Sequence, residues 1–139
     1  MSDRPADISE FNRAITEEFR ANGGSVPSTG MDILLLEHRG AKSGRSYSNP
    51  LVYTTDGDRY VVIASKGGDA DDPQWYRNLV AHPEVEIEVG DERLPVTATT
   101  ATDAERDRLY KAQESVYPQL TDYAARTTRS IPVVVFERR

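Results

Sequence analysis

The chain has 139 residues, a formal net charge of −6, 37% hydrophobic residues and no cysteine. This length suits one compact domain, and no apolar run approaches the roughly 20 residues that cross a bilayer. The absence of cysteine excludes disulfides, thiolate metal sites and thiol nucleophiles, and the acidic balance disfavours binding to nucleic acid or to an anionic membrane surface.

The polar N-terminal stretch Met1–Asp7 lacks the apolar segment of a secretory signal, so we expect a cytoplasmic protein. The first predicted element is a helix over about residues 8–22. Asp7 and Glu10 have the spacing of a capping box, and Ile15 and Phe19 recur on one face.

Three strands are predicted next. Residues 31–36 are almost continuously apolar, which is typical of a strand covered on both faces. A second strand over residues 46–54 and a third over residues 60–64 are expected to form a hairpin, because Asp56-Gly57 suits a two-residue turn.

A helix should begin at Asp72-Pro73, with an acidic N-cap and a proline in its first turn, and should stop at Pro83. Two further strands are predicted over residues 85–89 and 94–99.

The C-terminal part is predicted to contain two helices and one strand. Thr102 and Glu105 have capping-box spacing at the start of a helix, and Pro118 interrupts that helix and begins a shorter one. A last strand is predicted over residues 131–136. Because strands joined by hairpins outnumber helices and no βαβ alternation is present, the pattern favours an antiparallel barrel with peripheral helices.

A cationic segment, His38–Arg45, interrupts this acidic chain between the first two predicted strands. Arg39, Lys42 and Arg45 offer charge-assisted hydrogen bonds to phosphate or carboxylate, and two glycines allow close backbone approach. A solvated basic loop is the alternative.

Other chemistries are disfavoured. His38 and His82 have no metal-ligand spacing, so we expect no metal site, and no Gly-x-Ser-x-Gly elbow is present. Residues 40–43 resemble the end of a P-loop but lack its first glycine. The alternating glutamates of residues 84–88 are more typical of a solvated stripe than of paired catalytic carboxylates.

Three groups of residues remain as candidates. The strand end Ile63–Gly68 offers backbone donors, a hydroxyl and a cation, and Gln74–Asn78 offers an indole and an amide at a helix start. Trp75 has two interpretations, packing against Leu79 or forming the wall of a cofactor pocket. The third group consists of tyrosines that suit either a core or a pocket rim: Tyr110, Tyr117 and Tyr123.

In succession, these motifs resemble the deazaflavin-dependent nitroreductase family. The strings that carry the resemblance are residues 39–45 (RGAKSGR), 49–53 (NPLVY), 56–62 (DGDRYVV), 64–68 (ASKGG) and 73–79 (PQWYRNL). The resemblance is dense from about residue 34 to residue 89. It implies a single split β-barrel domain over residues 1–139, related to the barrels of the flavin reductase and pyridoxamine phosphate oxidase type.

The resemblance also implies the deazaflavin coenzyme F-420, whose phosphate and glutamate tail would explain a basic segment in an acidic protein. The implied cofactor-binding residues are Arg39, Ala41, Lys42, Ser43, Arg45, Tyr47, Ser48, Asn49, Pro50, Leu51, Val52, Ile63, Ala64, Ser65, Lys66, Gln74, Trp75, Tyr76, Arg77 and Asn78.

The implied activity is hydride transfer from the reduced coenzyme to an electron-poor acceptor such as a quinone, an activated alkene or a nitro compound. Tyr117 and Tyr123 are the implied catalytic residues. Leu120 lies between them, where the family would lead us to expect another hydroxyl, and this departure counts against nitro compounds as acceptors. Two alternatives are an FMN-binding reductase on the same barrel and a non-catalytic carrier of a deazaflavin or lipid-like ligand. A quinone acceptor would allow peripheral membrane contact, and the oligomeric state is left open.

Overall fold

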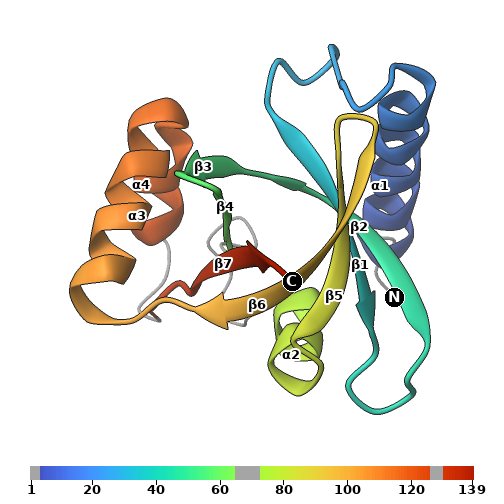
Figure 1. The fold of residues 1–139 in the computed structure, drawn as a ribbon. Helices are drawn as coiled ribbons and strands as arrows, with labels where there is room; N and C mark the ends of the chain where they lie inside the picture. Colours follow the sequence, from blue (N-terminus) through green and yellow to red (C-terminus); the bar gives the residue numbers. More distant parts are fainter. Residues whose placement is uncertain (1–3, 65–72, 126–129) are drawn as a thin grey trace.

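The computed structural model describes residues 4–64, 73–125 and 130–139 (Figure 1). Its elements are α1 (Arg4–Ala21), β1 (Ile33–Arg39), β2 (Ser46–Val52), β3 (Thr54–Asp56), β4 (Arg59–Ile63), α2 (Gln74–Ala81), β5 (Glu84–Val89), β6 (Glu92–Thr100), α3 (Asp103–Val116), α4 (Gln119–Ala125) and β7 (Val133–Arg138). The order of helices and strands predicted from the sequence is confirmed.

The described strands form one seven-stranded sheet in the order β2-β1-β5-β6-β7-β4-β3, and every neighbouring pair is antiparallel. The two edge strands, β2 and β3, are consecutive in the chain and only Tyr53 separates them. The sheet must therefore curl until its edges meet, and β2 lies against β4. The Tyr53 N–H donates a hydrogen bond to the carbonyl of Asp32 at 3.1 Å, which fixes this corner.

Strand alternation distributes the apolar side chains among three clusters. Leu34 and Leu36 of β1 enter the interior of the curled sheet together with Trp75 of α2. Ile33 and Leu35 face the other way and pack under α1. The prediction that this strand is covered on both faces is confirmed. The third cluster lies beneath α3 and α4, on the outward faces of β4 and β7. In Figure 1, α1 and the pair α3 and α4 cover different parts of the curled sheet.

Polar contacts attach α3 to the β3–β4 hairpin. Arg108 donates hydrogen bonds to Asp56 at 3.1 and 3.2 Å, and Arg59 donates to both Asp56 and Glu105. Hydrogen bonds from Arg108 and then Arg59 lower the pKa of the Asp56 carboxyl to about 2, so that group stays ionised through the neutral range. The same contacts fix the position of α3 over the end of the sheet.

Some element boundaries differ from the prediction. β1 continues through Arg39, so the first residues of the cationic segment belong to a strand. The predicted strand over residues 46–54 is broken at Tyr53, where the chain passes from one sheet edge to the other. The capping box predicted at Thr102 is not formed, because Thr102 makes no side-chain capping hydrogen bond and Glu105 pairs with Arg59.

Candidate functional site

A cavity of about 1030 Å³ lies between the β1–β2 loop, α2, β2 and the junction of α3 with α4. The predicted site residues that line it are Ala41, Lys42, Ser43, Tyr47, Asn49, Pro50, Leu51, Val52, Ile63, Gln74, Trp75, Arg77, Asn78 and Tyr117. Segments that are far apart in the sequence thus contribute to one cavity.

The lining also includes residues that the sequence did not single out as ligand contacts: Asn12, Met31, His38, Gly40, Pro73, Gln113, Gln119 and Leu120. His38 and Gln113 are the informative ones, because both are polar and buried. Their roles depend on partners that are distant in the sequence, so sequence motifs alone gave no signal for them.

Five of the predicted residues lie outside this lining. Arg39 lines a separate depression of about 330 Å³ beside the glutamates of β5. Arg45 and Ser48 are exposed on the loop and on β2. Ala64 is buried and donates its N–H to the carbonyl of Pro132, while the Tyr76 hydroxyl bonds to Thr100.

Three further predictions fall on parts of the chain that the structure does not describe. Ser65 and Lys66 lie outside the described residues. Tyr123 lies in α4, but its side chain is outside the described part as well. The roles assigned to all three stay predictions.

The cavity has two chemically different ends. Lys42, Ser43 and Arg77 lie at the end formed by the β1–β2 loop and α2. The other end is mainly apolar and is formed by Met31, Val52, Ile63, Tyr117 and Leu120. Tyr47 and Val52 both line the cavity and are five residues apart along β2, or about 17 Å at about 3.3 Å per residue. A long ligand with an anionic part and an apolar part suits this shape.

The glycines of the β1–β2 loop define the shape of the loop itself. The Gly40 N–H donates to the carbonyl of Arg45 at 2.8 Å, and the Gly44 N–H donates to the carbonyl of Gly40 at 3.0 Å. Gly44 has a φ of 70°, which favours glycine. A Cβ at Gly40 would lie 2.5 Å from Ser43 Oγ. Gly44 therefore suits the backbone of this tight loop whether or not a ligand is present, and at Gly40 a side chain would have to displace the Ser43 hydroxyl.

A chain of hydrogen bonds joins this loop to α2, β1 and β2. The Ala41 N–H donates to Asn78 Oδ1 at 3.0 Å, and Asn78 Nδ2 donates to His38 Nδ1 at 2.9 Å. His38 Nε2 donates in turn to Asn49 Oδ1 at 2.7 Å. Gln74 also donates to Asn78 Oδ1, at 3.0 Å. We call the chain Ala41–Asn78–His38–Asn49 the His38 network.

The His38 network fixes the protonation state of the imidazole. Because Nδ1 accepts from an amide N–H, the ring must be neutral with its proton on Nε2. His38 is 4% exposed and Asn78 is 1% exposed. Burial lowers the pKa of His38, and the hydrogen bond with Asn49 opposes this shift only in part. The imidazole therefore acts as a structural link between the loop and the helix at neutral pH.

The cations at this end of the cavity are available to a ligand. Among the described residues, Lys42 and Arg77 have no carboxylate within ion-pair distance, whereas Arg59, Arg93 and Arg108 are each paired with acidic side chains. Unpaired cations beside a cavity in a protein of net charge −6 indicate a site for an anion.

Trp75 has both of the roles that the sequence allowed, packing against Leu79 and lining a pocket. Its side chain is buried and packs in the same cluster as Leu79. The same residue lines the cavity. It is also the single tryptophan of the chain, which makes it a natural reporter of ligand binding.

Comparison with known proteins identifies the family. A family model described as F420H(2)-dependent quinone reductase matches residues 11–138. The chain belongs to this family. An F420H(2)-dependent quinone reductase of Mycobacterium tuberculosis (strain H37Rv) is 46% identical over 119 residues, covering 84% of this chain and 76% of the relative.

Solved structures agree with the family assignment. An F420-H2 dependent reductase, FDR-A, is 39% identical with a TM-score of 0.70, and the match covers 76% of this chain and 93% of that one. A pyridoxamine 5'-phosphate oxidase homologue from Listeria innocua is 9% identical with a TM-score of 0.56, covering 80% of this chain and 86% of that one. This second likeness concerns the fold alone, and it confirms the predicted split-barrel class.

The reductase is therefore an enzyme that uses coenzyme F-420 for hydride transfer to an electron-poor acceptor. The predicted cofactor is confirmed, and the FMN and carrier alternatives receive no support from the family. No described helix of the reductase is both long and apolar enough to span a membrane.

The His38 network predicts a pH dependence of stability. Because the pKa of His38 is lowered in the folded state, the unfolded chain binds the proton more tightly. The contribution of neutral His38 to the stability of the folded state is therefore complete above the ordinary histidine pKa of 6.5, and it is lost as the pH falls below that value. His38→Leu should lower the free energy of unfolding by about 1–3 kcal/mol at neutral pH and should weaken its dependence on pH.

Urea denaturation on either side of about pH 6.5 measures both effects. The matched control is His82→Asn, which removes the other histidine and should retain the acid-induced loss. Equal pH dependence in wild type and His38→Leu would contradict this account of the network.

Proposed function

We propose that this protein reduces a quinone inside the cavity, with the coenzyme tail held at the basic end and the quinone at the apolar end. One observation carries the proposal: Lys42 and Arg77, which pair with no carboxylate of the described residues, and the buried Tyr117 line the same cavity. A volume of about 1030 Å³ lies at the upper end of the range of ligand pockets, which suits a large cofactor beside a ring-shaped acceptor.

The residues at the basic end fit the coenzyme. Lys42 and Arg77 would pair with phosphate and glutamate carboxylates, and the Ser43 hydroxyl would add a hydrogen bond. The His38 network holds the loop that carries Lys42 against the helix that carries Arg77. The backbone that carries the two cations is thus fixed before the ligand arrives, which lowers the entropy cost of binding.

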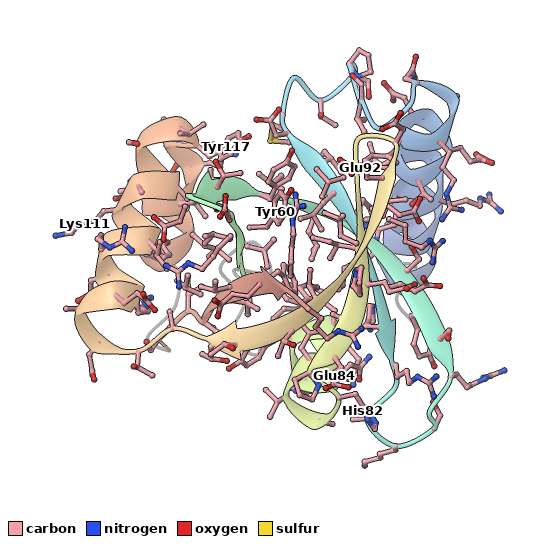
Figure 2. The ribbon with its side chains drawn as sticks, viewed as in Figure 1. Tyr60, His82, Glu84, Glu92, Lys111 and Tyr117 are labelled. Atoms are coloured by element: carbon pink, nitrogen blue, oxygen red, sulfur yellow. The ribbon has the colours of Figure 1, made fainter. Side chains whose placement is uncertain are left out.

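Tyr117 is the candidate proton donor at the apolar end. In Figure 2 its label lies near the top of the α3–α4 pair, on the side next to the sheet. Its side chain is buried, and its oxygen accepts a hydrogen bond from the Asp32 N–H at 3.1 Å. The hydroxyl proton remains available for an acceptor, and the Asp32 N–H would stabilise the phenolate that forms after proton transfer.

When bound, the coenzyme supplies a hydride from C5 of its reduced deazaflavin. The apolar lining at Met31, Ile63 and Leu120 excludes water around the acceptor. Tyr117 would provide the proton for one quinone oxygen; with the hydrogen and the two electrons that the hydride brings, both carbonyls of the quinone become the two hydroxyls of the hydroquinone. Solvent reprotonates the tyrosine. The role of Tyr123 as a second donor stays a prediction.

Reversal of charge at Lys42 tests the basic end. Lys42→Glu should weaken binding of the oxidised coenzyme by about tenfold, because attraction becomes repulsion, and the loss should grow with the length of the glutamate tail. Isothermal calorimetry with coenzymes of different tail length measures the effect. Lys111→Glu is the matched control, since Lys111 points outward from α3 in Figure 2. An equal loss for a deazaflavin fragment without a tail would refute the assignment.

Removal of the Tyr117 hydroxyl tests the apolar end. Tyr117→Phe keeps the ring and should lower the rate of quinone reduction by about a hundredfold, the usual scale for a general acid, with little change in coenzyme affinity. Stopped-flow oxidation of the reduced coenzyme measures the rate. Tyr60→Phe, outside the cavity lining, is the control, and Tyr123→Phe extends the test to the second predicted donor. An unchanged rate of quinone reduction would show that Tyr117 serves only in packing.

A further inference from the structure

Gln113 is a buried polar residue in the wall of the cavity. It lies on α3, is 3% exposed and lines the cavity. Its Oε1 accepts a hydrogen bond from the Thr54 hydroxyl at 2.9 Å, which orients the amide. Among the residues that the structure describes, its Nε2 has no hydrogen-bond partner. An amide N–H on a buried side chain is unfavourable unless a ligand or a water molecule accepts from it.

The surroundings of Gln113 define what that ligand would be. Tyr117 lies one helical turn later, and its backbone N–H donates to the carbonyl of Gln113 at 2.8 Å. The Tyr117 hydroxyl is held by the Asp32 N–H, and the Gln113 amide is held by the Thr54 hydroxyl. Tyr53 directly precedes Thr54 and donates its backbone N–H to the carbonyl of Asp32, so the two holding residues are themselves connected. Among the described residues neither donor has an acceptor, and Gln113 and Tyr117 both line the cavity from neighbouring supports.

We propose that Gln113 Nε2 donates a hydrogen bond to the quinone carbonyl oxygen that Tyr117 protonates, and that it makes the site selective for carbonyl acceptors. This inference rests on the proposed function. As the hydride adds to the quinone, negative charge develops on this oxygen, so a fixed N–H donor stabilises the transition state more than the ground state. An apolar ring without a carbonyl gains nothing from the amide and leaves it unpaired.

Fluorescence of Trp75 provides a direct test that does not depend on turnover. The full-length protein is titrated with menadione and, in parallel, with methylnaphthalene, which has the same rings and no oxygen. Gln113→Leu should weaken menadione binding about tenfold and leave methylnaphthalene binding unchanged or slightly stronger. Thr54→Val, which keeps Gln113 but removes its anchor, should weaken menadione binding to a smaller extent.

Kinetics with the reduced coenzyme distinguish a failure of the role of Gln113 from a failure of the proposed function. In Gln113→Leu we expect a higher KM for menadione and a lower kcat, at unchanged affinity for the coenzyme. Unaltered menadione binding and turnover in this variant, with an active wild type, would overturn the role of Gln113 and leave the proposed function intact. Equal weakening of both probes would also overturn it, since the effect would then come from cavity shape. A wild type that binds the coenzyme but reduces no quinone would overturn the proposed function and this inference together.

Discussion

Closure of the sheet is the constraint on which the site depends. β2 and β3 lie at opposite edges of a seven-stranded sheet, yet only Tyr53 separates them in the chain. The sheet can satisfy this connection only by curling. Curling places β2, most of whose residues line the cavity, between the β1–β2 loop at one end and the helices α3 and α4 at the other. A single continuous space thus receives both a basic and an apolar lining.

The His38 network converts this space into a defined site. A short loop that carries a lysine would ordinarily be free to move, but here the Ala41 N–H and the Asn78 side chain fix it to α2. The cost of burying Asn78 and His38 is met because the side-chain oxygen and nitrogen of Asn78 and both ring nitrogens of His38 have hydrogen-bond partners. The acidic chain therefore places positive charge at one end of the cavity, and no carboxylate of the described residues pairs with Lys42 or Arg77. Elsewhere several described arginines pair with acidic side chains, as Arg93 does with Glu86 at 3.0 Å.

The sequence predicted the order of elements well because each has a local signal, such as the apolar run of β1 or the proline between α3 and α4. The split-barrel topology and the cofactor came from resemblance, since strand order depends on distant pairings. Arg39 shows the limit of the approach. The whole cationic segment His38–Arg45 is predicted as a loop, but β1 continues to Arg39, so strand alternation turns His38 inward and Arg39 outward. His38 and Gln113 were not predicted as site residues, because their partners are distant in the sequence. Asn78 is 40 residues from His38, and Thr54 is 59 residues from Gln113.

The central claim is that the basic end of the cavity recognises the anionic tail of the coenzyme. The most direct measurement compares the affinities of oxidised coenzyme F-420 and FMN for the full-length protein at matched ionic strength, over a range of salt concentrations. The account predicts that the coenzyme binds more tightly than FMN and that its affinity falls more steeply with salt, because more charges are paired. Equal affinities with the same salt dependence, or tighter binding of FMN, would contradict it.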